Sequence, residues 1–365
     1  MEYYLKEVLY DGNNRMSAMV KPREDVERIF ISEKIRPLEI VSTENSRQKA
    51  DGLKKIKYHW DIKRNLDSVF SGTDPGDVVY IQFPMVEHSI FQSAVFRKHR
   101  NRGVRFVLLI HDLELLRLAV NKDSAGLSRI RAILENRDVL KSCDRVIVHN
   151  EKMAQKLREY GVKDDRIVVL GIFDYLVDGF EDIEFKKTLC SGDKKVIIAG
   201  NLVKTKVGYV YDLPKDVCFN LYGVDYTGKP GGNISYKGAF LSEDLPYELE
   251  GDFGLVWDGS SSDTCEGVYG EYLRINNPHK TSLYLAMGIP VIVWENAAIA
   301  DLIGKEHCGI KIGSLKELSG RLKEMDETGY NELKNNAGIV GKRLREGYYT
   351  RKAIKDCRFR TAREN

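Results

Sequence analysis

Short apolar runs alternate with longer segments of helical periodicity through the first half of the chain. The apolar runs have the length of buried strands and cover residues 77–82, 104–110, 144–148 and 167–170. Segments with apolar positions at helical spacing lie between them, at residues 24–33, at residues 46–70, up to about residue 141 and at residues 151–160. Strands that alternate with helices are typical of a doubly wound parallel sheet.

A polar stretch separates this half from a second one of similar design. Residues 178–193 are rich in Asp, Glu, Lys and Gly, which is typical of a linker. Beyond it the pattern predicts strands at residues 195–199, 217–222, 233–238, 253–257, 290–294 and 309–312, and helices at 296–303 and from about 314 to 361. Two α/β domains are therefore predicted, residues 1–178 and residues 179–345, with a C-terminal helix at residues 346–365 that crosses back to the first.

Composition narrows the class of protein. A formal charge of +3 over 365 residues gives no reason to expect a nucleic-acid partner. Residues 1–10 lack the apolar core of a signal peptide and no apolar run could span a bilayer, so we expect a cytoplasmic protein. The basic segment 345–363 leaves peripheral contact with the inner membrane face open. The cysteines have no CxxC pair, which predicts reduced, mostly buried thiols at Cys143, Cys190, Cys218, Cys265, Cys308 and Cys357.

Residues 276–294 encode a helix start, a helix stop and a buried strand in one run. Asn277 is predicted to be the N-cap and Pro278 the first helical residue, and Gly288 ends the helix before the strand. His279 and Lys280 then fall in the first turn, where the helix dipole disfavours cations. A phosphate bound by the free N–H groups of that turn would make this arrangement favourable. A solvated lysine beside an ordinary helix start is the alternative.

Polar residues also follow strands of the first domain, where open α/β sheets bind their ligands. His111, Asp112 and Arg117 come after the strand 104–110, and His149 follows the strand 144–148. Asp112 as a simple helix cap and His111 as a packed residue are the alternatives. The chain has no Walker A run, GxGxxG fingerprint, GxSxG elbow or HExxH pair. Kinase, dehydrogenase, hydrolase and metalloprotease functions are therefore disfavoured.

Several runs of the second half resemble the C-terminal domain of bacterial GT-B glycosyltransferases of the galactofuranosyltransferase-like group. This group includes the glucosyltransferases that act on the N-acetylglucosamine of serine-rich-repeat adhesins. The similar runs are AGNLVKTK (199–206), NLYG (220–223), ISYKGAF (234–240), FGLVWDG (253–259), residues 263–294 and AAIADLI (297–303). In the first half QFP (82–84), LIHDLELLR (109–117), HNEKM (149–153) and GIFDYL (171–176) match the same group. Residues 1–70 match more loosely.

The resemblance implies a GT-B fold of two facing Rossmann-like domains, with a UDP-sugar donor held by the second domain and a glycan acceptor by the first. It places Asn201, Lys204, Lys206 and Gly223 near the pyrophosphate or base, and Asn277, His279 and Lys280 at the diphosphate. Asp258 and Tyr272 would contact the ribose or the donor sugar, with loop capping as the alternative. It also implies a homo-oligomer, a dimer or a tetramer, and no cofactor or metal ion.

Retaining GT-B enzymes often carry two glutamates seven residues apart around this helix, and Leu283 occupies the second position here. An inverting mechanism is therefore predicted, with Asp112 or His111 as the general base. Arg117 and, more weakly, His149 would position the acceptor or its loop. A nucleotide-sugar epimerase of similar fold and a non-catalytic partner of another transferase are the alternatives. The sequence names neither the hexose nor the acceptor, which could be a glycoprotein or a lipid-linked glycan.

Overall fold

The computed structural model describes residues 1–8, 20–41, 53–87, 89–113, 136–180 and 194–358. The chain forms two compact units. The first comprises residues 1–14, 26–170 and 350–365, and the second comprises residues 15–25 and 171–349. Of the described helices, none is both long enough and apolar enough to cross a bilayer.

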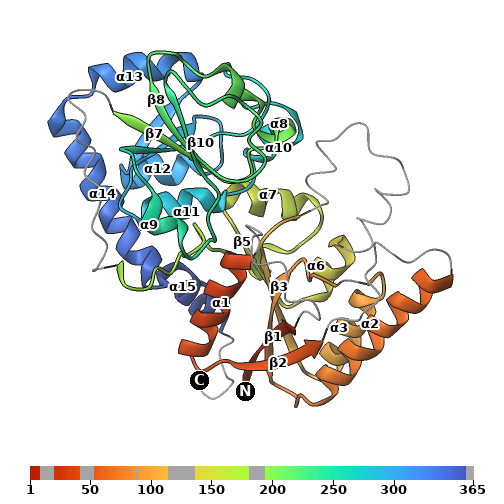
Figure 1. Cartoon of the computed structure of the whole chain (residues 1–365). Helices are drawn as coiled ribbons and strands as arrows, with labels where there is room; N and C mark the ends of the chain where they lie inside the picture. Colours follow the sequence, from red (N-terminus) through yellow and green to blue (C-terminus); the bar gives the residue numbers. More distant parts are fainter. Residues whose placement is uncertain (9–19, 42–52, 88, 114–135, 181–193, 359–365) are drawn as a thin grey trace. The chain divides into compact units, whose positions relative to one another are not determined.

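Among its described residues, the first unit contains a six-stranded parallel sheet with the order β2-β1-β3-β4-β5-β6 (Figure 1). The strands are β1 (Glu2–Val8), β2 (Arg36–Val41), β3 (Val78–Phe83), β4 (Arg105–Ile110), β5 (Arg145–Val148) and β6 (Ile167–Val169). The helices are α1 (Val20–Ser32), which runs on from the second unit, α2 (Leu53–Ser71), α3 (Gln92–Asn101), α6 (Asp138–Ser142), α7 (Glu151–Glu159) and the 3-10 turn η3 (Asp164–Arg166).

Among its described residues, the second unit contains another six-stranded parallel sheet, with the order β12-β11-β10-β7-β8-β9. The strands are β7 (Lys195–Ala199), β8 (Cys218–Tyr222), β9 (Ile234–Gly238), β10 (Phe253–Val256), β11 (Val291–Trp294) and β12 (Gly309–Ile312). The helices are α8 (Lys204–Val207), α9 (Leu245–Glu248), α10 (Gly267–Tyr272), α11 (His279–Ala286), α12 (Ala300–Glu306), α13 (Leu318–Glu324), α14 (Glu327–Arg345) and α15 (Tyr348–Cys357), which ends in the first unit, with 3-10 turns η5 (Gly208–Asp212) and η6 (Leu315–Glu317).

The predicted doubly wound parallel sheets are confirmed, with corrections at several elements. β1 and β2 were not predicted, and α1 begins at Val20 instead of residue 24. The helix predicted at 296–303 lies at Ala300–Glu306. The described cysteines are free, and all but the half-buried Cys218 are buried, as expected, whereas Cys190 lies outside the described residues.

Helix α11 is fixed against the sheet by a glycine and a tyrosine. A side chain at Gly254 of β10 would place its Cβ 2.2 Å from ring atoms of Tyr284, so only glycine leaves room for the ring. The Tyr284 hydroxyl accepts a hydrogen bond of 2.7 Å from the backbone N–H of Ala199 at the end of β7. The helix therefore lies across β10 and β7, the two strands that flank the change of direction in the sheet.

Candidate active site

The second sheet changes direction between β7 and β10. Its first strand, β7, has β8 and β9 on one side and β10, β11 and β12 on the other. In open α/β sheets of this order, ligands bind outside the carboxyl ends of the strands at such a switch point. Gly200 follows β7 there, and Asp258 follows β10 after Trp257.

Two glycines let the backbone chains leaving β7 and β8 approach each other closely. A Cβ at Gly223, whose φ is +147°, would lie 1.7 Å from the carbonyl oxygen of Gly200. The N–H of Gly200 donates to the carbonyl of Tyr222 at 2.9 Å, and the N–H of Leu202 donates to the carbonyl of Val224 at 2.9 Å. The close approach of the two backbone segments therefore requires a glycine at position 223. The predicted contact of Gly223 with the nucleotide stays a prediction.

Lys280 and Asp258, both predicted to contact the donor, are brought together. The Lys280 ammonium donates to the Asp258 carboxylate at 2.9 Å and to the carbonyl of Trp257 at 2.8 Å, and both side chains are largely buried. Lys280 is thus neither the solvated lysine of the alternative interpretation nor a cation without a counter-charge. The pair holds a positive group in the first turn of α11, beside the carboxyl end of β10.

The predicted cap of α11 is wrong. Pro278 occupies the N-cap position, no side chain of the described residues caps the helix, and the first helical residue is His279. The Asn277 amide instead donates to the carbonyl of Gly171 at 2.5 Å. Because Asn277 is buried, its amide needs a hydrogen-bond partner in place of water, and the carbonyl of Gly171 is that partner. The sequence predicted that this side chain would instead cap α11.

His279 is not a cation at neutral pH. Burial, followed by the positive charge of Lys21, lowers the pKa of His279 to about 3, against a hydrogen bond from its ring to the backbone of Asp174 that raises it. Its ring centroid lies 5.1 Å from that of Tyr175 and 6.4 Å from that of Phe173. Within the described chain its buried Nε2 atom has no hydrogen-bond partner. Of the two residues expected to be cations in the first turn of α11, Lys280 is therefore the one that carries a positive charge at neutral pH.

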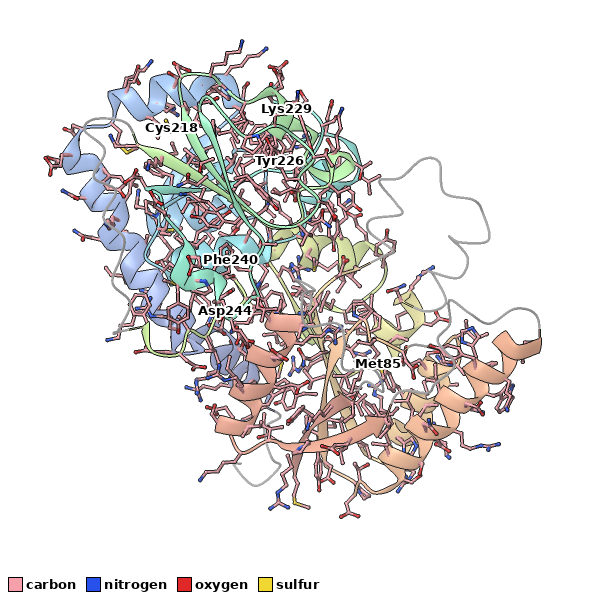
Figure 2. The ribbon with its side chains drawn as sticks, viewed as in Figure 1. Met85, Cys218, Tyr226, Lys229, Phe240 and Asp244 are labelled. Atoms are coloured by element: carbon pink, nitrogen blue, oxygen red, sulfur yellow. The ribbon has the colours of Figure 1, made fainter. Side chains whose placement is uncertain are left out.

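The lysines after β7 lie against aromatic rings. The Lys204 ammonium is 5.5 Å from the ring centroid of Tyr211, and that of Lys206 is 5.8 Å from the centroid of Tyr269. Tyr211 also stacks at 5.9 Å on Tyr226, which lies in the loop after β8 (Figure 2). Lys204 and the two rings that the lysines contact are exposed and Lys206 is half-buried, so a cation–π contact of this kind leaves each ammonium group able to bind an anion.

Asn201 and Tyr272 have mainly local roles in the structure. The Asn201 side chain accepts from the N–H of Val203 at 2.8 Å and donates to Asp225 at 3.3 Å. Tyr272 ends α10 with a buried ring, and its carbonyl accepts from the N–H groups of Ile275 and Asn276. Their predicted contacts with the donor stay predictions.

In the first unit, β4 and β5 bring three predicted residues to one edge. His111 and Asp112 follow β4; a ring nitrogen of His111 bonds the Gln82 side chain at 2.7 Å, and Asp112 accepts from the N–H of Leu113 at 2.8 Å. His149 follows β5 and is buried, with Nε2 donating to the carbonyl of Ile110 at 3.0 Å. Burial lowers the pKa of His149 to about 4. Arg117 lies outside the described residues.

The contact to Gln82 was missed from the sequence, although a signal was present. Gln82 is the one polar residue in the run Val78–Phe83, and it is buried. A buried amide needs a partner, which here is His111 on the adjacent strand end. Across the described residues, no group of three His, Cys, Asp or Glu side chains is placed to hold a metal ion.

Comparison with known proteins identifies the family. The domain described as "Glucosyltransferase 3-like, N-terminal domain" matches residues 2–172, and its C-terminal counterpart matches residues 196–357. The chain is 36% identical over 293 residues to the beta-1,6-galactofuranosyltransferase WbbI of Escherichia coli K12, covering 80% of this chain and 82% of WbbI. It is 27% identical over 301 residues to glucosyltransferase 3 of Streptococcus gordonii, covering 81% and 84% of the two chains.

A solved structure agrees on the fold. HepE of Anabaena, determined in complex with UDP, superposes with a TM-score of 0.58 at 10% identity and covers 98% of this chain and 99% of its own. At that identity the likeness concerns the architecture alone, which is GT-B. The chain therefore belongs to the glucosyltransferase 3-like family and is a glycosyltransferase of the GT-B fold.

Proposed function

We propose that this enzyme transfers a hexose, glucose or galactofuranose, from a UDP-sugar to a sugar hydroxyl of a glycan. The relatives support this choice, because WbbI is named a galactofuranosyltransferase and the streptococcal relative a glucosyltransferase. HepE, which shares the fold, was solved with UDP. We further propose an inverting transfer that needs no resident cofactor and no metal ion.

The Lys280–Asp258 pair at the switch point carries the proposal. An ammonium group has three N–H donors, and the carbonyl of Trp257 and the carboxylate of Asp258 use two of them. The third can donate to a diphosphate oxygen without breaking the pair. The first turn of α11 adds N–H groups and the positive end of the helix dipole. Together these groups would stabilise the charge that develops on UDP as the bond to the sugar breaks.

On the acceptor side we propose Asp112 as the general base, with His111 as the alternative. The base takes the proton of the acceptor hydroxyl while the oxygen of that hydroxyl attacks the anomeric carbon of the donor sugar. The bond between this carbon and the diphosphate breaks, and UDP leaves. Asp112 is half-buried, which leaves its carboxylate accessible. His149 is a poor base, because it is buried and its Nε2 atom already bonds a backbone carbonyl. We therefore assign His149 to positioning of this edge.

Turnover with UDP-glucose and UDP-galactofuranose tests the proposal. The purified chain is incubated with each donor, with and without simple sugar acceptors, in the presence of a chelator, and the products are followed by mass spectrometry and NMR. Transfer with inversion at the anomeric carbon supports the proposal. An isomerised UDP-sugar formed without acceptor would indicate an epimerase, and neither UDP binding nor turnover would indicate a non-catalytic partner.

The variant Asp112→Asn separates binding from chemistry. Asparagine keeps the hydrogen bond to Leu113 but is no base, so we expect transfer to slow by about 10²–10⁴-fold with unchanged affinity for UDP. Calorimetric titration with UDP and initial rates measure the two quantities. Transfer at the wild-type rate would show that another group takes the proton, and His111→Gln is the next variant.

The acceptor, the cellular location and the assembly complete the proposal. We propose an enzyme of the cytoplasm that acts at the inner membrane face on a lipid-linked glycan, with a glycoprotein acceptor as the alternative. We also propose a homo-oligomer, which light scattering coupled to size exclusion would detect. The acceptor screen therefore includes both a lipid-linked and a soluble glycan.

A further inference from the structure

An exposed apolar and basic surface lies on α2 and on the turn before α3. We call it the α2 surface, and its residues are the exposed Ile56, Lys57, Trp60, Arg64 and Ile90 together with the half-buried Lys63. The exposed fraction is 55% for Ile56, 50% for Trp60 and 36% for Ile90. Apolar side chains this large are unusual as a group on open surface, and such groups mark interaction sites.

Helix α2, which carries the α2 surface, is packed against the first unit through its opposite face. The opposite face of α2 is buried through Tyr58, Ile62, Leu66 and Phe70. Ser89 donates to the carbonyl of His59 at 2.9 Å, and the ring of Trp60 lies 5.3 Å from that of Phe91. The exposure of Trp60 is therefore not the fraying of a loosely attached helix.

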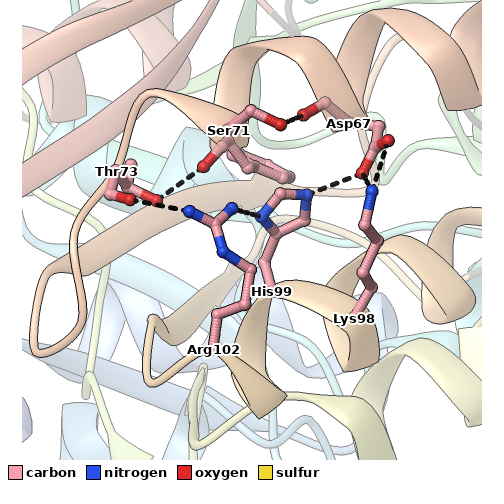
Figure 3. Close-up of polar contacts among 7 residues, drawn as sticks. Asp67, Ser71, Thr73, Lys98, His99 and Arg102 are labelled. Carbon is pink, nitrogen blue, oxygen red and sulfur yellow. Dashed lines mark hydrogen bonds and ion pairs between the residues drawn. The ribbon is translucent and has the colours of Figure 1, made fainter.

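A polar cluster pins α2 to α3 (Figure 3). The Asp67 carboxylate on α2 receives hydrogen bonds from the His99 ring at 2.7 Å and from the Lys98 ammonium at 2.7 Å. Arg102, just after α3, donates to the other ring nitrogen of His99 at 2.9 Å and to the carbonyl of Thr73 at 3.4 Å. This cluster fixes the position of α2 on the unit and so orients its outer face.

The chemistry of the α2 surface fits the interface of a bilayer. The Lys63 ammonium lies 4.2 Å from the ring centroid of Trp60, and Lys57 and Arg64 are exposed on the same side of the helix. A tryptophan ring prefers the boundary between lipid head groups and acyl chains, and long basic side chains extend from there to anionic head groups. Asp61 is the acidic neighbour on this part of α2, and it is half-buried.

We propose that the α2 surface docks the enzyme on a membrane that contains anionic lipid. A second copy of the chain is a poorer occupant, because a two-fold contact through this face would bring the cations of both copies together. An anionic lipid surface instead meets Lys57, Lys63 and Arg64 with opposite charge. The inference deepens the proposed function by favouring the lipid-linked acceptor, but the binding that it predicts needs no turnover.

Flotation of the full chain with vesicles tests the proposal. Vesicles of phosphatidylcholine with about a quarter phosphatidylglycerol should bind the protein, and pure phosphatidylcholine vesicles should bind it at least about fivefold less, since each basic residue near an anionic surface contributes about that factor. The variant Trp60→Ser should weaken binding by at least about tenfold. The double variant Lys57→Gln with Arg64→Gln should also bind anionic vesicles more weakly than the wild type, and it should lose the preference for anionic over neutral vesicles. Ile339→Ser, at a 55% exposed position of α14, is the matched control and should bind as wild type.

Several results would overturn the proposal. The first two are a wild type that does not bind anionic vesicles and a wild type that binds both vesicle types equally. The third is equal binding of the Trp60→Ser and Ile339→Ser variants. The fourth is a lower molecular mass of the Trp60→Ser variant in light scattering, which would assign the α2 surface to a contact with a second copy. Transfer to a soluble acceptor should be unchanged in all variants. Vesicle binding without any transfer would contradict the proposed function alone, and transfer without vesicle binding would contradict this inference alone.

Discussion

Lys280 is the residue on which donor binding should depend most. Removing its ammonium takes one charge-assisted hydrogen bond from the diphosphate and leaves the buried Asp258 carboxylate beside it unpaired. We expect Lys280→Ala to raise the dissociation constant for UDP by about 10- to 100-fold, measured by calorimetric titration. Lys316→Ala, which breaks an exposed pair with Asp263 in the same unit, is the control and should leave it unchanged.

The variant Asp258→Asn distinguishes a binding role of Lys280 from a purely structural pair. Asparagine still accepts the hydrogen bond from Lys280 but removes a negative charge from the neighbourhood of the diphosphate. If Lys280 binds phosphate, UDP affinity is kept or increased in this variant. A loss of affinity as large as that of Lys280→Ala, with equal loss of thermal stability, would mean that the pair only supports the fold.

His149 should make the stability of the protein sensitive to mild acid. Burial lowers its pKa from the ordinary 6.5 to about 4, so between these values the unfolded chain binds a proton that the folded chain does not. Stability is therefore full above about pH 6.5 and falls as the pH decreases towards 4. From about pH 7 to about pH 5 this one group accounts for a loss of about 2 kcal/mol.

The variant His149→Gln tests this pH dependence. The glutamine amide can donate to the carbonyl of Ile110 as Nε2 does, but it does not titrate. Urea unfolding at the two pH values should show a loss of stability smaller by about 2 kcal/mol in the variant than in the wild type. An identical loss in both proteins would show that His149 titrates normally in the folded chain.

At the scale of elements, the cluster between α2 and α3 should be a main source of local stability. His99 is fully buried and bonds both Asp67 and Arg102, so His99→Ala leaves a carboxylate and a guanidinium without their shared partner. We expect a loss of about 1–3 kcal/mol in the free energy of unfolding. Lys98→Ala removes only an exposed contact to the same carboxylate and should cost less than about 1 kcal/mol. Equal losses in chemical denaturation would contradict this assignment.

The sequence predicted the buried strands and also the edge strands β9 and β12, and it missed β1 and β2. β7 has the predicted bounds, and β4, β10 and β11 each differ by one residue, because their apolar runs are nearly uninterrupted and almost entirely buried. β1 mixes polar and apolar residues, and β2 lies at the sheet edge with Pro37 and mostly exposed or half-buried positions, so neither has the pattern of a buried strand. A continuous apolar run therefore identifies a strand, whereas a strand of mixed pattern such as β1 or β2 can be missed.

At the scale of the whole molecule, the fold was predictable, whereas the partners of the site residues were not. As the sequence predicted, His111 and Asp112 follow β4 and Asp258 comes shortly after β10, while Lys280 lies in the first turn of α11; their contacts with a ligand stay predictions. The contact of Asn277 joins it to Gly171, 106 positions away, and the charge that helps to keep His279 neutral comes from Lys21. Such contacts depend on the packing of distant segments, and no spacing along the chain encodes them.

One buried ion pair shows how strongly the second unit depends on the start of the chain. Lys21 and Asp25, in the first turns of α1, form an almost completely buried salt bridge. The Lys21 ammonium also donates to the carbonyl of Leu176 at 2.8 Å, and Asp25 accepts from the N–H of Leu176 at 3.1 Å, 151 positions later. The pair therefore fixes the backbone at Leu176, next to Tyr175, whose ring packs against His279.

Breaking this pair from one side should destabilise the protein severely. Asp25→Ala leaves a buried ammonium without its counter-charge, for which we expect a loss of about 3–5 kcal/mol in the free energy of unfolding. The double variant Lys21→Met with Asp25→Leu buries no charge, so it should lose much less than the sum of the single variants. Lys342→Met, which breaks an exposed pair with Glu346 at the same i,i+4 spacing, should change stability by less than about 0.5 kcal/mol. Urea unfolding of the full chain measures all of these, and additive single and double losses would mean that Lys21 and Asp25 act independently.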